Sequence, residues 1–284
     1  MIAMAKGSPP PVPLLDRMSL KALGTLRRLR RKLVPELLEY APLGWNTPLP
    51  AGEQGWLSAG VLAEERRKWT EFAALADSAG PLGFSHEAAS LQEVDNLKFH
   101  NLNLTFGYVL LKAAFGRERL SVLDWGGGLG YYYLLARAFL PPEVRLDYHC
   151  KDVATLVQAG RELAPTICWH GDDTCLEQSY DLVMVSGSLQ YCREWRPLLQ
   201  RMRQATRSYF FLTRTPVVRE AASFVAVQKA YDTLMLHQQF NEAELLAEIR
   251  SLGFQLVREV VTGDLTYIRN APEDAVLKGW LFAV

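Results

Sequence analysis

The chain is 284 residues long, with 49% hydrophobic and 22% charged residues, so it has enough apolar material for a large core. Its 31 basic and 31 acidic residues give a net charge of +0. A neutral balance provides no global field that would steer the protein toward nucleic acid, so we expect no nucleic-acid partner.

The basic residues are concentrated near the N-terminus. Residues 1–45 hold eight basic and three acidic side chains, and they begin with a Pro-rich tail that we expect to be disordered. Leucines recur at helical spacing over 19–39, with arginines on the other side, which predicts a basic amphipathic helix. Such a helix can pack on its own protein, support a homodimer, or lie on an anionic membrane surface, and we favour packing on protein.

The sequence also bears on location and metal binding. The first residues, MIAMAKGSPPPVP, have prolines where the apolar part of a signal peptide would lie, and no apolar run is long enough to span a bilayer. The four cysteines form no CxxC pair and have no histidine at zinc-ligand spacing, so we expect free thiols and no metal. We therefore expect a soluble, cytoplasmic protein.

The remaining chain predicts an α/β fold. Residues 41–60 are loop-like, and helices are expected over 61–79 and 94–116. Short apolar runs then alternate with helical patterns, which predicts a doubly wound, mostly parallel sheet with helices on both faces. The last two runs flank the turn residues 262–264 and should form an antiparallel hairpin. The expected strands are 120–124, 144–150, 166–170, 180–186, 208–213, 254–261 and 265–270, and the helices between them are 130–140, 153–164, 195–206 and 241–253.

A glycine cluster, VLDWGGGLG, follows the first of these strands. The dinucleotide pattern GxGxxG fails, because it would need glycine at Tyr131. The pattern acid-x-Gly-x-Gly-x-Gly instead matches at Asp124, Gly126, Gly128 and Gly130. This turn between a strand and a helix resembles motif I of class I S-adenosylmethionine (SAM) dependent methyltransferases, which implies a seven-stranded Rossmann-like sheet and SAM as cofactor. A tight turn without a ligand is the alternative.

Acidic residues after the next two strands match this resemblance. Asp152 follows the second strand, where a carboxylate can accept hydrogen bonds from both ribose hydroxyls. Asp147 is its rival if the strand is shorter, and Asp152 could instead cap the next helix. After the third strand, Asp172 and Asp173 stand where the family commonly places an acid near the adenine amino group, although either can be a turn residue.

The fourth strand ends at Ser186 and is followed by Gly187. In the resembled family this segment lies under the methionine part of SAM and faces the acceptor. Gly187 permits close approach of the backbone, and Gln190 and Tyr191 offer hydrogen-bonding groups beside the sulfonium. We therefore expect Ser186 and Gly187 to bind the cofactor, and Gln190 and Tyr191 to act in catalysis or acceptor binding.

A narrower resemblance rests on LDWGGGLG, YHCKD…GREL, YDLV…SGSLQY and FFLTRTPVV…SFVAVQ. These segments are similar to a little-characterised bacterial branch of class I methyltransferases associated with surface polysaccharide and other secondary biosynthesis. The resemblance covers about residues 94–260. We accordingly divide the chain into a tail and helical extension over 1–93 and a SAM-binding domain over 94–284, with a lid insertion at about 217–240.

Methyl transfer from a sulfonium requires alignment of the acceptor and, for a hydroxyl, removal of a proton. Among the histidines, we expect His149 and His170 to face the core, and His100 and His237 to be candidates for catalysis. Arg214, at the end of the fifth strand, suggests an anionic group on the acceptor, with an ion pair to a neighbouring acid as the alternative.

The expected function is methyl transfer to a hydroxyl or amine of a small-molecule acceptor, sugar-like or anionic. The absence of an acid–Pro–Pro–aromatic signature at the fourth strand argues weakly against nucleic-acid bases and amide nitrogens as acceptors. A non-catalytic scaffold with the same fold and an NAD(P)-dependent oxidoreductase are the competing interpretations.

Overall fold

The computed structural model describes residues 38–88 and 90–284, which belong to one compact unit. Most of the predicted basic helix over 19–39 therefore lies outside the described residues. Its last two residues were predicted wrongly, since Leu38–Tyr40 form strand β1 by pairing with β7. The division expected at residue 94 is not seen, because the described residues before it belong to the same unit as the sheet. No described helix is both long and apolar enough to cross a membrane.

The predicted helices and parallel strands are confirmed, with ends shifted by a few residues. The helices are α2 (Ala59–Ala76), α3 (Leu97–Ala114), α4 (Tyr131–Phe139), α5 (Ala154–Leu163), α6 (Trp195–Ala205) and α7 (Glu242–Ser251). The further strands are β2 (Arg119–Trp125), β3 (Arg145–Lys151), β4 (Cys168–His170), β5 (Tyr180–Ser186), β6 (Thr206–Val218), β7 (Phe224–Ala230), β8 (Thr233–Asn241), β9 (Gln255–Thr266) and β10 (Ala275–Ala283). Short 3-10 turns are η2 (Gly44–Asn46), η3 (Gly55–Leu57), η4 (Asp173–Glu177) and η5 (Leu189–Tyr191).

Seven of the strands form the expected Rossmann-like sheet. Their order is β4-β3-β2-β5-β6-β10-β9, and β10 runs antiparallel to both of its neighbours while the others are parallel. The chain first winds outward from β2 to β4 and then returns to β5 on the other side of β2. The carboxyl ends of β2 and β5 therefore meet at the switch point where ligands bind in such sheets.

The sheet ends in an antiparallel hairpin, as predicted, but the turn and the second strand of this hairpin were predicted wrongly. The turn-like residues Thr262–Asp264 lie inside β9 as a bulge opposite β10, where the register jumps between Val276 and Lys278. The run 275–283 supplies the second strand of the hairpin. The bulge explains the error, because glycine and aspartate mark bulges as well as turns.

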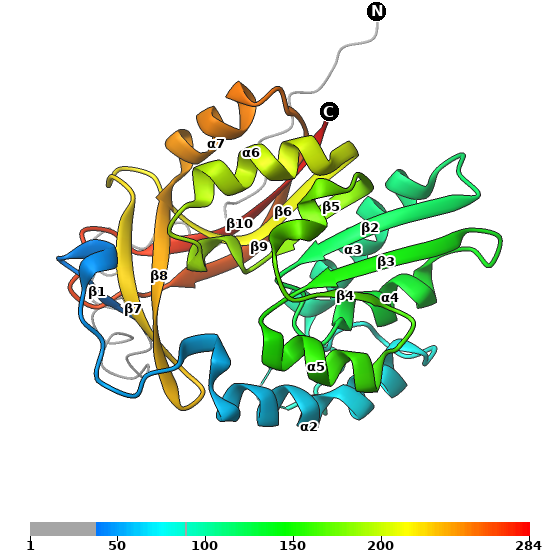
Figure 1. Cartoon of the computed structure of the whole chain (residues 1–284), viewed down its shortest axis with the longest axis horizontal. Coiled ribbons are helices and arrows are strands. Elements are labelled where there is room, and N and C mark those ends of the chain that lie inside the picture. The colour runs from blue at the N-terminus through cyan, green and yellow to red at the C-terminus, as the bar shows by residue number, and fades with distance from the viewer. Residues whose placement is uncertain (1–37, 89) are drawn as a thin grey trace, which may run out of the picture. The chain divides into compact units, whose positions relative to one another are not determined.

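The segment 217–240, predicted as a lid insertion, extends the sheet instead of folding separately. β6 is 13 residues long and outruns β5, whose last pair is Ser186 with Thr213. Beyond that point β8 pairs with β6 in parallel at Val217 and Val218, and β7 and β1 follow antiparallel at the edge. Figure 1 shows β1, β7 and β8 together at one end of the sheet, beyond the strand ends of the central region.

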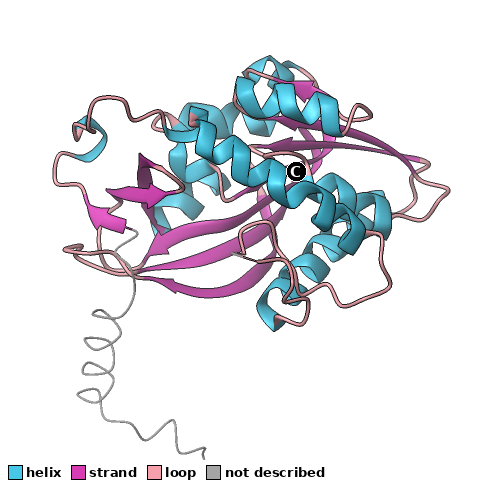
Figure 2. Ribbon diagram, turned by 90° about the horizontal axis from the view of Figure 1, so that it is seen from below, coloured by secondary structure: helices cyan, strands magenta, loops and turns pink. Residues whose placement is uncertain are grey.

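Helices cover both faces of the sheet, as Figure 2 shows. One face packs on α2, α3, α4 and α5, and the other packs on α6 and α7. The alternation of side chains along each strand separates these two cores: Val122 faces the first, whereas Leu123 faces the second. With its two faces covered, the central sheet leaves its edges open, and the carboxyl ends of β2 and β5 meet at one of them.

Candidate active site

The glycine turn after β2 needs glycine for two different reasons. Gly126 has φ of 75°, and a Cβ there would lie 2.3 Å from Cβ of Ser188. Gly128 has φ of 60°, and a Cβ there would lie 3.6 Å from Oε2 of Glu65, an ordinary contact distance, so a larger side chain would project into the cavity described below. Gly130 begins α4 and packs against Ile167, outside the described lining of that cavity.

A cavity of about 390 Å³ opens at this turn, a volume typical of small-molecule sites. Its walls come from the carboxyl ends of β2, β3 and β5, from the middle of β6, from α2, and from the β7–β8 hairpin. Arg214 was predicted to end its strand but lies inside β6 (Thr206–Val218). The predicted site residues that line it are Asp124, Gly126, Gly128, Asp152, Ser186, Gly187, Gln190, Tyr191, Arg214 and His237. The topology thus brings together predicted site residues that lie up to 113 positions apart in the chain, from Asp124 to His237.

Asp152 stands directly after β3 and is held by backbone amides. Its Oδ2 accepts from the amide of Gly128 at 2.8 Å, and its Oδ1 accepts from the amide of Val153 at 2.7 Å. Burial raises the pKa of Asp152 to about 6, although both amide hydrogen bonds lower it. The rival Asp147 lies near the start of β3, where it pairs with Arg119 at 2.6 Å, so it is outside the cavity. The alternative that Asp152 caps the next helix is wrong, because the N-cap residue of α5 is Val153 and no side chain caps this helix.

Asp124 is fully buried at the end of β2. Its Oδ2 accepts from the Tyr148 hydroxyl at 2.9 Å, whereas Oδ1 finds no hydrogen-bond partner in the described part of the chain. Burial raises the pKa of Asp124 to about 7. An unsatisfied buried acceptor is costly unless a ligand donates to it, so this oxygen points to a bound donor.

The acids after β4 take structural positions. Asp172 caps η4 by accepting from the amide of Thr174 at 3.0 Å. Asp173 accepts from Nε1 of Trp125 at 2.9 Å and lies 3.3 Å from Nζ of Lys151. Neither acid is among the described residues that line the cavity, although Asp173 holds Trp125 and Lys151, which do.

The segment after β5 contributes a compact polar wall. Ser186 Oγ lies 3.1 Å from the Tyr132 hydroxyl, and Gly187 has φ of 68°. Gln190 donates to the Gly187 carbonyl at 2.7 Å, and its Oε1 is buried without a partner among the described residues. Tyr191 donates to Gln228 of β7 at 2.6 Å, so the hairpin and this segment meet across the cavity.

The two candidate histidines lie in different places. His100 is on α3, where its Nδ1 accepts from the amide of Leu82 at 3.1 Å, and it is not part of the described cavity lining. His237 of β8 lines the cavity and packs edge-on against Tyr191, with ring centroids 5.1 Å apart. Burial lowers the pKa of His237 to about 3, so its imidazole is neutral at physiological pH.

Arg214 lies at the point where β6 leaves β5 for β8. It is a non-glycine residue with φ of 55°, a strained conformation that is enriched at functional sites. Its guanidinium is buried, forms an ion pair with Glu87 and lies 3.4 Å from Ser186 Oγ. Burial lowers the pKa of Arg214 to about 10. The structure thus shows the ion pair that was the alternative to acceptor binding.

The sequence did not identify Glu65 of α2 as a site residue. Its Oε1 accepts from the Tyr231 hydroxyl at 3.0 Å, and its buried Oε2 has no partner within the described residues. Burial raises the pKa of Glu65 to about 7. A signal was present, since Glu65 falls on the stripe of buried residues Val61, Trp69 and Phe72. A lone acid on an apolar stripe marks a position that packing does not explain.

The sequence also did not identify two aromatic residues of the cavity, Trp56 before α2 and Tyr231 between β7 and β8. Trp56 of η3 packs edge-on against Tyr191 at 4.9 Å and against Tyr231 at 6.0 Å, and all three line the cavity. Tyr231 lies in the turn between β7 and β8 and has φ of 55°. These three rings add an aromatic wall to the cavity, and the Tyr231 hydroxyl joins that wall to Glu65.

Comparison with known proteins gives similarity of structure at low identity. No protein-family model and no curated protein matches the sequence. Solved structures similar to this chain include magnesium protoporphyrin IX methyltransferase from Synechocystis PCC 6803, at 15% identity over 81% of this chain and 96% of that one, with a TM-score of 0.49. A second is 1,6-didemethyltoxoflavin-N1-methyltransferase from Burkholderia thailandensis, at 14% identity over 84% and 93% of the two chains, with a TM-score of 0.45. A third is an amino pentose methyltransferase from Micromonospora echinaspora, at 16% identity over 65% and 90%, with a TM-score of 0.45.

Proposed function

We propose that this chain is a SAM-dependent methyltransferase that acts on a hydroxyl or amine of a small-molecule acceptor. The observation that carries the proposal is the pairing of the glycine turn after β2 with Asp152 after β3. The Gly128 amide and the Asp152 carboxylate are in direct contact, at the switch point of the sheet.

The residues of the cavity fit this cofactor. SAM carries a cationic sulfonium, an ammonium group and ribose hydroxyls, all of which favour carboxylate acceptors. Asp124 Oδ1 is a buried acceptor without a partner among the described residues, and Asp152 lies in the same lining. We assign Asp152 to the ribose hydroxyls, as the matching position in the resembled family does, and Asp124, Ser186 and Gly187 to the methionine end. Gly128 leaves the space that a side chain would fill.

The acceptor half is assigned to the aromatic wall and Arg214. Trp56, Tyr191 and Tyr231 offer flat apolar surfaces, and His237 and Gln190 offer polar edges, a combination typical of small-molecule sites. An anionic group of the acceptor would bind Arg214 by replacing Glu87, whose side chain is 44% exposed and free to turn outward. No large charged face is needed for this acceptor, in keeping with the net charge of +0.

The chain's own contribution to the reaction is orientation and proton removal. When bound, SAM supplies an activated methyl group that needs no further catalysis by the protein. Glu65 is placed to accept the proton of the acceptor, because its free Oε2 lies at the cavity and its pKa is about 7. Tyr231 donates to the other oxygen of Glu65 and fixes its orientation. The half-buried Tyr191 and Trp56 rings and the Tyr231 ring, which is 42% exposed, line this end of the cavity and reduce its contact with water.

Two other functions share the fold. An NAD(P)-dependent oxidoreductase would use a GxGxxG turn, and Tyr131 stands where its last glycine is needed. A non-catalytic scaffold would have no need for a buried acid of raised pKa at the cavity. We include in the proposal that the acceptor belongs to surface polysaccharide or other secondary biosynthesis, as the narrower sequence resemblance implies.

Calorimetry separates these functions. We expect SAM and S-adenosylhomocysteine to bind at micromolar level, about −8 kcal/mol, and NADH not to bind. Methyl-labelled SAM offered with a panel of hydroxylated and amino compounds, each with and without an anionic group, should then label a subset. Binding of NADH in place of SAM would overturn the methyltransferase, and SAM binding without transfer to any compound would favour the scaffold.

A further inference from the structure

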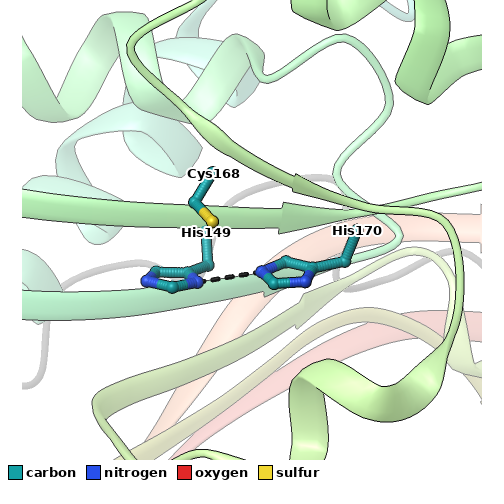
Figure 3. A group of neighbouring side chains, drawn as sticks. All are labelled: His149, Cys168 and His170. Carbon is teal, nitrogen blue, oxygen red and sulfur yellow. Dashed lines mark hydrogen bonds between the residues drawn. The ribbon is translucent and has the colours of Figure 1, made fainter.

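Three side chains with metal-ligating atoms meet at the outer edge of the sheet. His149 belongs to β3, and Cys168 and His170 belong to β4. The two strands are parallel, with His149 opposite Cys168 and Lys151 opposite His170, so the three side chains share one face of the sheet. Figure 3 shows them grouped together. Their ligand atoms all lie within 4.8 Å of one another.

The described cysteines are free, as expected from the sequence, but strand pairing places two histidines beside Cys168. The spacing from His149 to Cys168 and His170 matches no common zinc motif, because strand pairing and not local sequence brings the residues together. The two histidines, expected to face the core, contact each other, with Nδ1 of His149 2.9 Å from Nε2 of His170. All three residues lie outside the described lining of the proposed cofactor cavity, so this cluster is a separate feature.

The ligand set selects the kind of metal. Two imidazole nitrogens with one thiolate suit Zn²⁺ and similar borderline cations, whereas Mg²⁺ and Ca²⁺ prefer oxygen. With Zn–N about 2.0 Å and Zn–S about 2.3 Å, tetrahedral ligand atoms are roughly 3.3–3.6 Å apart. The two nitrogens would therefore separate by a few tenths of an ångström, and the Cys168 sulfur would close in by about 1 Å. Cys168 is exposed on a short edge strand, where such a rotation of its side chain meets little resistance.

His149 is already held in a ligand's orientation. Its Nε2 lies 3.5 Å from Oδ1 of Asp147, the arrangement of carboxylate, imidazole and metal that fixes which nitrogen coordinates. Asp147 is itself fixed by Arg119 at 2.6 Å. The His149 ring also packs edge-on against Tyr180, with centroids 5.0 Å apart. Nδ1 is thus left to face His170 and Cys168.

We propose that His149, Cys168 and His170 form a binding site for a Zn²⁺-like cation, with water as the fourth ligand. Burial decreases across the three, from His149 through His170 to the exposed Cys168, so the fourth position faces solvent. Three protein ligands and an open position distinguish this site from a closed structural zinc site. The site does not depend on the proposed methyltransferase activity.

The test uses the full chain, freed of metal by dialysis against a chelator and then titrated with Zn²⁺ and, separately, Co²⁺. We expect one equivalent of Zn²⁺ to bind at micromolar level or tighter, and Co²⁺ to give a thiolate charge-transfer band together with the intense visible bands of four-coordinate cobalt. Cys168→Ser should abolish the charge-transfer band and weaken Zn²⁺ binding at least tenfold. His170→Gln should weaken Zn²⁺ binding to a similar extent.

Cys192→Ser is the matched control, since Cys192 is another free thiol outside the cluster and its loss should change neither band nor affinity. Circular dichroism establishes that each variant is folded, and the exposed Cys168 makes Cys168→Ser the decisive one. Absence of stoichiometric Zn²⁺ binding would overturn the proposal and leave a hydrogen-bonded histidine pair. Zn²⁺ binding that survives both Cys168→Ser and His170→Gln would also overturn it.

Discussion

Buried acids at the two edges of the parallel sheet have pKa values that are shifted in opposite directions. At the amino edge, Asp181 accepts from the Ser121 amide and hydroxyl, both at 2.9 Å, and pairs with Arg207 at 3.2 Å and Arg117 at 3.3 Å. Despite burial, the hydrogen bonds from Ser121 and Arg207 lower the pKa of Asp181. At the carboxyl edge, burial raises the pKa values of Asp124, Asp152 and Glu65.

The difference separates stability from function. An acid that is paired with arginines and accepts hydrogen bonds from the protein stabilises the folded state. A buried acid without a close cationic partner destabilises the folded state until a ligand supplies that partner. Several carboxyl groups with shifted pKa values in one cavity are typical of functional sites. The amino edge is therefore structural, and the carboxyl edge is prepared for a cationic ligand with hydrogen-bond donors.

The largest expected effect comes from closing the cavity at the glycine turn. Gly128→Val introduces a side chain at φ of 60° that projects into the cofactor half, so SAM binding should become undetectable by calorimetry. Gly116→Val is the matched control, because Gly116 also has a positive φ, of 72°, but faces open space after α3. Equal loss of SAM binding in both variants would show that backbone strain, and not the cavity, is responsible.

Glu65→Gln tests the acid proposed to accept the proton. We expect kcat on the acceptor found by screening to fall by about two to four orders of magnitude, the usual contribution of a general base. SAM affinity should change by only a few-fold. The wild-type rate should decline below about pH 7, and this acid limb should vanish in Glu65→Gln. Tyr231→Phe removes a hydrogen bond that lowers the pKa of Glu65, so it should move the limb to higher pH. An unchanged profile in both variants would remove Glu65 from the reaction.

Arg214 and Lys151 both line the cavity at the carboxyl edge, and the pairing of Arg214 with Glu87 decides the role of Arg214. Arg214→Ala should leave SAM affinity unchanged and lower turnover by about one to three orders of magnitude if it binds an anionic acceptor. Glu87→Gln should then lower the KM for that acceptor, since the guanidinium no longer needs to exchange partners. If instead both variants lower Tm alike and leave KM unaltered, the ion pair is structural.

A matched pair of aspartates sharpens the comparison between the two edges. Asp152→Asn should weaken SAM by about 1.5–3 kcal/mol, or roughly 10- to 150-fold, the range for hydrogen bonds to charged groups. Asp181→Asn removes the acid that holds Ser121 and Arg207, so it should lower Tm while leaving SAM affinity within about two-fold. Normal SAM binding by Asp152→Asn would assign the ribose to another residue.

The sequence predicted the carboxyl edge better on one side of the cavity than on the other. Asp124, the glycines and Asp152 follow strands and precede helices, so their positions are fixed by local pattern and by the order of strands in the sheet. Trp56 and Tyr231 come from an extension and a hairpin whose position depends on pairing of β8 with β6 and of β1 with β7, and Glu65 lies on α2, which packs on the core shared with α4 and α5. Such long-range contacts leave no periodic pattern in the local sequence. The contact of His149 with Cys168 and His170 could not be predicted for the same reason, since it depends on strand pairing.

The smallest expected effect is the response of the free protein to pH. Because Glu65 and Asp124 bind protons more readily when folded, with pKa values of about 7 against the usual 4.5 and 3.8, ionising them costs folding free energy. These two acids should therefore lower the stability by about 1.5 kcal/mol as pH rises from about 6.5 to 8. His86 and His237 act in the opposite direction, because burial lowers the pKa of each in the folded chain, whereas in the unfolded chain both imidazoles release protons near pH 6.5. The contribution of Asp124 is therefore measured as the difference in slope between the wild type and Asp124→Asn. SAM should reduce that contribution, since it binds the ionised Asp124 carboxyl and gains affinity over the same window. The matched control is Asp181→Asn, whose pKa lies far below this range, so its slope should equal that of the wild type, whereas Asp124→Asn should flatten it. Equal slopes in the wild type and in Asp124→Asn would mean that Asp124 is already paired, and the contrast between the two edges would fail.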